Sequence, residues 1–110
     1  MTFEDLTAAI RQFAVERDWE QFHTPKNLAM AVAGEAGELV AELQWLAADD
    51  PLSPEQRQAV IAEMADVLIY LCRMADVLGV DLLAAASEKL AANGLRYPVA
   101  DVKGSSAKRG

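Results

Sequence analysis

Apolar residues recur at helical spacing along almost the whole chain, and this pattern restricts the chain to helical folds. No segment shows the strict alternation of apolar and polar residues that is typical of a half-buried strand. Helix N-caps are expected at Thr2, Thr24, Ser53 and Asp81, and prolines follow the second and third of them. The predicted helices span residues 2–18, 24–48, 53–79 and 81–94. Four helices with short connections predict an all-α fold, an antiparallel four-helix bundle.

Length and composition indicate one domain. The chain has 110 residues, of which 53% are apolar, so it can bury a core and is not disordered overall. We expect the domain to cover residues 1–98 and a flexible tail, rich in Gly, Ser and Lys, to cover residues 99–110. A chain of this size covers its own apolar surface only in part, so we expect an oligomer.

The charge balance excludes several classes of partner. Asp and Glu outnumber Lys and Arg 17 to 10, which gives a formal net charge of -7. Without a basic stripe, binding of nucleic acid through its phosphates is not expected, and a phosphorylated ligand would need a cation to mediate the encounter.

The apolar runs are too short to span a membrane, and the N-terminus lacks the pattern of a secretory signal. We therefore expect a cytoplasmic protein.

Carboxylates line one edge of the second predicted helix. Glu35, Glu38 and Glu42 fall on one stripe, which Trp45 continues, and residues 27–56 contain no Lys or Arg to neutralise them. Glu42 has two open interpretations, a further metal ligand or a solvated residue. An acidic i, i+3 pair alone is more typical of a solvated helix face than of a metal site.

The third predicted helix strengthens the case for a metal site. It is apolar around most of its circumference, yet Glu63 and Asp66 lie on a narrow polar stripe, where burial of a charge is costly unless it is compensated. Two adjacent antiparallel helices, each with an acidic pair, can direct four carboxylates at one point. Such oxygen ligands suit Mg²⁺ or Mn²⁺. With His23 as the single histidine, zinc and Glu-x-x-His di-iron sites are poorly supported.

Aromatic and basic residues add a possible ligand site. Trp19 and His23 precede the acidic helix, and together with Trp45 they could stack on a flat base or could simply anchor the core. Lys89 and Arg96 are rare basic residues in an acidic chain and could contact phosphates.

Three segments resemble the MazG-like all-α nucleotide pyrophosphohydrolases, in particular the dCTP pyrophosphatase branch and the short bacterial MazG-like proteins. The resemblance extends from about Ala14 to Val99, and it is carried by the segments "RDWEQFHTPKNLAMAVAGEAGELVAELQW", "EMADVLIYL" and "KLAANGLRYPV". The family pattern, Glu-x-x-Glu followed by Glu-x-x-Asp on the next long helix, is present without a departure at the matched positions.

The resemblance implies hydrolysis of a nucleoside triphosphate to its monophosphate and pyrophosphate. The implied cofactor is Mg²⁺, which Mn²⁺ could replace, and the implied role is clearance of unwanted nucleotides. The implied substrate is dCTP or a modified dCTP, and the implied assembly is a homodimer or homotetramer with shared active sites. The implied metal ligands and catalytic residues are Glu35, Glu38, Glu63 and Asp66. The implied base pocket comprises Trp19, His23 and Trp45, and the implied phosphate or sugar contacts are Lys89, Asn93, Arg96 and Tyr97.

Other functions fit the same residues. The reaction could act on dUTP or on damaged nucleotides, because aromatic stacking accepts any base. The acidic stripe could instead bind a basic protein partner, which would make the chain a non-catalytic interaction module. A structural ion that only holds the helices together is a third alternative. In the catalytic interpretation, Glu35 or Glu38 is the hypothetical general base.

Overall fold

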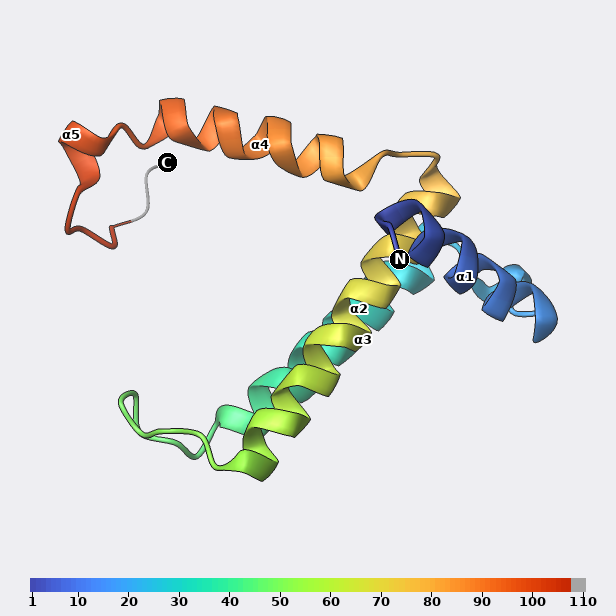
Figure 1. Ribbon diagram of the computed structural model, residues 1–110, viewed down its shortest axis with the longest axis horizontal. Helices are drawn as coiled ribbons and strands as arrows, with labels where there is room; N and C mark the ends of the chain where they lie inside the picture. The colour runs from blue at the N-terminus through green and yellow to red at the C-terminus, as the bar shows by residue number, and fades with distance from the viewer. Residues whose placement is uncertain (108–110) are drawn as a thin grey trace. The chain divides into compact units, whose positions relative to one another are not determined.

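The structure, a computed structural model, describes residues 1–107 (Figure 1). Within this range every regular element is helical, which confirms the predicted all-α class. The chain divides into two compact units, one from Met1 to Gly79 and a second that begins at Val80. No helix within residues 1–107 is long and apolar enough to cross a membrane.

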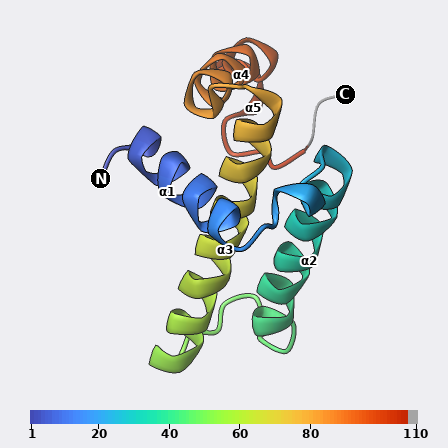
Figure 2. The ribbon, with the colours of Figure 1, turned by 90° about the vertical axis from the view of Figure 1, so that its right-hand side faces the viewer.

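The first unit is built on a pair of long helices. It comprises α1 (Phe3–Glu16), the 3-10 helix η1 (Glu20–Phe22), α2 (Pro25–Leu43) and α3 (Pro54–Leu78). Helices α2 and α3 lie side by side, joined by the loop at their lower ends in Figure 2, and α1 packs against α3. The most deeply buried apolar side chains come from all three helices, namely Ala14, Leu28, Cys72 and Ala75.

Side-chain caps fix where the helices begin. The Thr2 hydroxyl accepts a hydrogen bond from the Asp5 amide at 3.0 Å, and the Asp5 carboxylate accepts one from the Thr2 amide at 2.9 Å. A second capping box joins Ser53 and Gln56 at the start of α3, with distances of 3.1 and 2.9 Å. Each box satisfies two amides that lack a partner within the helix. At the start of α2, the Thr24 side chain accepts a hydrogen bond from the Asn27 amide without forming a capping box, and Pro25 occupies the first turn.

The end of α2 differs from the prediction. The helix stops at Leu43 instead of near Ala48, because the following residues form a turn. The Asp50 carboxylate accepts a hydrogen bond from the Ala47 amide at 2.9 Å, and the Asp50 amide donates to the Ala47 carbonyl at 3.0 Å. Such local side-chain bonds compete with continuation of a helix. Trp45 therefore lies beyond α2 and is 90% exposed.

The second unit contains α4 (Leu82–Arg96) and the short α5 (Val99–Val102). Asp81 caps α4 as expected, but the helix continues past Asn93–Gly94 to Arg96. The helix ends there because a proline disfavours the helical backbone conformation at the residue before it, and Pro98 follows Tyr97. A single domain over residues 1–98 and a flexible tail over 99–110 stay predictions. The tail segment contains α5, and its residues 108–110 lie outside the described range.

Helix α3 is less buried than its composition suggested. Within the first unit it packs against α2 and α1, while several of its apolar side chains stay exposed by more than a third. These side chains include Ile61, Met64, Leu68, Leu71 and Leu78. The isolated chain therefore leaves much of the apolar surface of α3 uncovered.

Gly79 ends α3 with a left-handed backbone, φ 68°, so Gly79→Ala is expected to destabilise the protein by about 1 kcal/mol. Gly34→Ala is the matched control, because Gly34 lies inside α2 and a Cβ there meets no atom within 4 Å. We expect this control to stabilise the metal-free protein by up to about 1 kcal/mol. Urea unfolding measures both changes, and equal shifts for the two variants would contradict the proposed backbone origin.

Candidate metal centre and adjoining cavity

Three carboxylates from two helices converge in the first unit. Glu35 of α2 and Glu63 and Asp66 of α3 each offer an oxygen, and these oxygens all lie within 4.8 Å of one another. Glu63 and Asp66 share a face of α3 because residues three apart are neighbours on a helix. The packing of α2 along α3 adds Glu35 to that face.

The cluster is short of hydrogen-bond donors. One oxygen of Glu35 and one of Glu63, Oε2 in each case, are buried without a hydrogen-bond partner. Within residues 1–107, the ion pairs do not involve either side chain. Burial of carboxylate oxygens without donors is unfavourable, so these atoms need a proton or a cation.

The electrostatics of the cluster have the same physical origin. Burial, together with the neighbouring carboxyl groups of Glu38 and Glu35, raises the pKa of Glu63 to about 7. Burial and the adjacent Glu38 also raise the pKa of Glu35 above its ordinary value. Without a cation, both groups therefore hold protons more tightly than free glutamate does. An all-oxygen donor set with excess negative charge fits a hard divalent cation.

The other two glutamates of the stripe lie apart from these three. Glu38 is outside the group of convergent oxygens, although its carboxyl group is near enough to raise the pKa of both Glu35 and Glu63. Glu42 is exposed near the end of α2 and is not a member of the group. The structure thus brings together three of the four predicted ligands, with Glu38 beside them.

A cavity of about 340 Å³ adjoins the carboxylates. It is lined by Ala9, Ile10 and Phe13 of α1, Glu35 of α2, and Asp66, Ile69 and Tyr70 of α3. Its volume lies within the range of small-molecule sites, roughly 300–1,000 Å³. Because Glu35 and Asp66 belong both to the cavity wall and to the acidic cluster, an apolar group in the cavity would lie next to the candidate metal position.

The contribution of α1 to this cavity was not foreseen from the sequence. Ala9, Ile10 and Phe13 are spaced i, i+1 and i+4 on α1, an ordinary apolar face that is equally typical of a core contact. Tyr70 carried a clearer signal, because it follows Asp66 by four residues on the polar stripe of α3. The sequence indicated the carboxylates but not the wall opposite them.

The predicted base-pocket residues do not line this cavity. Trp19 packs edge to face against Phe13, with ring centroids 5.7 Å apart, so it lies behind one wall residue. The Trp19 amide donates to the Ala14 carbonyl at 2.9 Å in the turn that ends α1, and this bond fixes its backbone. His23 is 6.4 Å from the Trp19 ring, and Trp45 extends beyond α2. Their role at a base stays a prediction.

The predicted phosphate and sugar contacts belong to the second unit. Lys89, Asn93 and Arg96 lie on α4, where spacings of three and four place them along one side of the helix. Tyr97 follows as the C-terminal cap, and the Arg96 guanidinium lies 5.7 Å from the centre of its ring. The role of these four residues stays a prediction.

Residues 23–98 match the family described as the MazG nucleotide pyrophosphohydrolase domain. The dCTP pyrophosphatase 1 proteins of Bos taurus and Homo sapiens are each 44% identical to the chain over 111 residues, or 97% of its length. The chain spans only 66% and 65% of the length of these two relatives. A crystal structure of a pyrophosphatase from Archaeoglobus fulgidus superposes with a TM-score of 0.75 at 35% identity, over 86% of this chain and 91% of that one.

The pKa of Glu63 generates a test of the cluster. Between the ordinary glutamate value of 4.5 and about 7, folded Glu63 keeps a proton that the unfolded chain releases. The free energy of unfolding of the metal-free protein therefore falls as pH rises through this interval. Glu63→Gln removes this loss, so we expect the variant to gain stability relative to the wild type as pH rises.

Thermal unfolding of both proteins in chelator, at about pH 5 and about pH 8, measures the effect. Glu42→Gln, on the same acidic stripe but outside the cluster, should show the same pH dependence as the wild type. A Glu63→Gln profile parallel to the wild type would contradict the raised pKa.

Proposed function

The chain belongs to the MazG nucleotide pyrophosphohydrolase family, and from this membership we propose that it is a Mg²⁺-dependent nucleoside triphosphate pyrophosphohydrolase. The substrate we propose is dCTP or a modified dCTP, and the products are the monophosphate and pyrophosphate. The names of the relatives, dCTP pyrophosphatase 1, support this choice of base. Removal of unwanted nucleotides from the cytoplasmic pool is the corresponding cellular role.

One observation carries the proposal: the acidic cluster and the apolar cavity share Glu35 and Asp66. A nucleoside triphosphate combines a flat base with a polyanion, and it therefore needs an apolar site next to a site that tolerates negative charge. With a divalent cation at the carboxylates, the cluster would accept phosphates, while Phe13, Ile69 and Tyr70 would contact the nucleoside. Mn²⁺ could replace Mg²⁺ at the same oxygen ligands.

Glu35, Glu63 and Asp66 would hold the cation. When bound, it supplies charge neutralisation at the phosphate oxygens and favours ionisation of water. The protein must also accept a proton. The attacking water loses one proton as its oxygen bonds to the α-phosphorus, and the bond from the α-phosphorus to the bridging oxygen of the leaving pyrophosphate breaks. Between Glu35 and Glu38, we assign this general base to Glu38, since it lies beside the three convergent oxygens without being one of them.

The remaining substrate contacts are assigned from the family resemblance. Trp19, His23 and Trp45 would surround the base, and Lys89, Asn93, Arg96 and Tyr97 would contact phosphates or sugar. The position of Trp19 against Phe13, a wall residue of the cavity, supports the first assignment. The basic character of Lys89 and Arg96 in an acidic chain supports the second.

We also propose that the chain forms a homodimer or homotetramer with shared active sites. Apolar side chains on α2 and α3 are exposed in the single chain, including Met30 at 62% and Met64 at 57%. Leu90 and Leu95 of α4 are exposed as well. Exposure on this scale is expected where another subunit covers the surface.

The alternative of a non-catalytic interaction module has less support. A basic partner protein would require exposed carboxylates, whereas one oxygen each of Glu35 and Glu63 is buried. A structural ion would fit the acidic cluster but would leave the adjoining cavity without a role. The same reaction on dUTP or a damaged nucleotide differs only in the base that the cavity accepts.

The purified protein should convert dCTP or 5-methyl-dCTP to monophosphate and pyrophosphate in the presence of Mg²⁺ and not in chelator. The assay compares the four deoxynucleoside triphosphates, dUTP and 5-methyl-dCTP, with chromatographic separation of the products. A faster reaction with dUTP than with dCTP or 5-methyl-dCTP would contradict the proposed preference for a cytosine base. Absence of product from every nucleotide, with a melting temperature raised by Mg²⁺, would support a structural ion instead.

Glu38→Gln should lower kcat by about 10²-fold or more while Mg²⁺ still raises the melting temperature, because a lost general base affects the chemical step. Glu35→Gln, which removes a proposed ligand, should weaken both turnover and the response to metal. Glu42→Gln is the control on the same helix and should resemble the wild type. If Glu38→Gln also lost its response to Mg²⁺, Glu38 would be a ligand rather than the base.

A further inference from the structure

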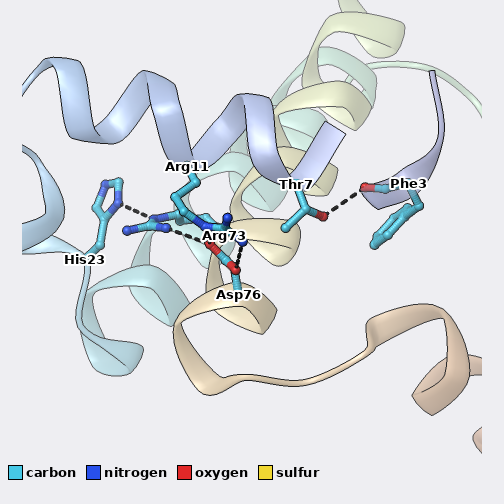
Figure 3. A network of polar contacts seen from close by, with 6 residues as sticks. All are labelled: Phe3, Thr7, Arg11, His23, Arg73 and Asp76. Atoms are coloured by element: carbon cyan, nitrogen blue, oxygen red, sulfur yellow. Dashed lines mark hydrogen bonds and ion pairs between the residues drawn. The ribbon is translucent and has the colours of Figure 1, made fainter. Parts of the chain in front are cut away.

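Arg73 is the one charged side chain that is buried within the described range, with 6% of its surface exposed. It lies on α3, and its guanidinium donates through Nε to His23 Nδ1 at 2.9 Å and through Nη1 to Asp76 Oδ2 at 3.0 Å (Figure 3). Burial of a guanidinium is costly unless its donors are satisfied. The proposed metal ligands are not among its partners.

Asp76 connects this pair to α1. Its carboxylate also accepts two hydrogen bonds from Arg11, from Nε at 2.8 Å and from Nη2 at 2.6 Å (Figure 3). Arg11 and Arg73 both hold the pKa of Asp76 below its ordinary value, so the carboxylate stays charged. The network therefore joins α1, the His23 loop and α3 through side chains of two arginines and one aspartate.

The contact with Arg73 determines the protonation state of His23. A guanidinium has only N–H donors, so the imidazole Nδ1 must accept. The ring is then neutral, with its proton on Nε2. Burial and the nearby Arg73 charge lower the pKa of His23, while Glu20 of the same loop opposes them. The other charged groups of the network are Asp76, which accepts a hydrogen bond from Arg73, and Arg11, which donates to Asp76.

His23 in turn contacts an aromatic series that leads to the cavity. Its ring lies edge to face with Trp19, and Trp19 lies edge to face with the wall residue Phe13. Phe13 and Trp19 are both partly exposed, at 48% and 42%, and the Arg17 guanidinium lies 3.5 Å from the centre of the Phe13 ring. The wall residue Phe13 is thus linked through Trp19 to a histidine that accepts a hydrogen bond from Arg73.

We propose that Arg73 is a positioning residue for nucleotide binding, which fixes His23 as the Nε2–H tautomer and thereby holds Trp19 and Phe13 in place at the cavity. This role rests on the proposed function for the identity of the ligand. It differs from a purely structural role, in which Arg73 would only join α1 to α3 through Asp76. Arg11→Met provides the matched control, because it removes the bond from α1 to Asp76 and leaves the contact between Arg73 and His23 intact.

The local part of the proposal can be measured without activity. The chain has a single histidine, so ¹⁵N NMR of the imidazole reports His23 alone. We expect the Nε2–H tautomer in the wild type and in Arg11→Met. In Arg73→Met the ring should become a mixture of tautomers, and its pKa should return toward the ordinary value of 6.5. An unchanged tautomer and pKa in Arg73→Met would overturn the proposal.

The functional part is measured as KM against kcat with dCTP and Mg²⁺. Arg73→Met should raise KM by about fivefold or more and change kcat by less than about twofold, because binding is affected and the carboxylates are not. Relative to the wild type over the same interval, its KM should also rise further between about pH 7.5 and about pH 5.5, as His23 becomes protonated. Arg11→Met should change neither quantity, although it lowers the melting temperature.

If Arg73→Met does not fold, Arg73→Lys replaces it, because a single ammonium cannot reproduce the planar fork that engages both His23 and Asp76. It should change the His23 tautomer and KM in the same direction. A changed tautomer with an unchanged KM, in an active protein, would overturn the positioning role alone. A wild type that hydrolyses no nucleotide would overturn the proposed function, and the positioning role with it.

Discussion

Close packing of α2 along α3 places like charges from two helices next to one another, and the candidate site depends on this contact. Apolar side chains on both helices favour the packing, whereas Glu35, Glu63 and Asp66 oppose it when all three are ionised. A proton or a cation must therefore accompany the folded arrangement. The same contact creates one side of the cavity, so the energetics of the helix pair and the chemistry of the site have a common origin.

Much of the fold could be predicted because its signals are local. The caps at Thr2, Thr24 and Ser53 and the terminating Gly79 each act within one helical turn, and the structure has all four. The errors occurred where two local signals compete. A turn from Leu43 to Leu46 follows α2, and Asp50 forms a further turn with Ala47 where the helix was expected to continue. Asn93–Gly94 does not end α4, because Pro98 imposes a later boundary.

The candidate site was predictable only in part. Acidic residues spaced by three on apolar helices indicated the cluster, since helical periodicity fixes which side chains share a face. The cavity wall on α1 and the bond between His23 and Arg73 depend instead on tertiary packing. The latter joins residues separated by 50 positions, and the place of Arg73 on the polar stripe of α3 does not indicate its partner. Such contacts require the three-dimensional arrangement of α1, the loop and α3.

The raised pKa of Glu63 has a consequence for how the protein responds to its surroundings. A carboxyl group that holds a proton near neutrality must release it when a cation binds, so uptake of the cation is an exchange of one positive species for another. Acidification and depletion of divalent cations would then both favour the protonated, cation-free cluster. In the pH range below that pKa, the occupancy of the candidate centre by a cation would depend on the proton concentration as well as on the concentration of the cation.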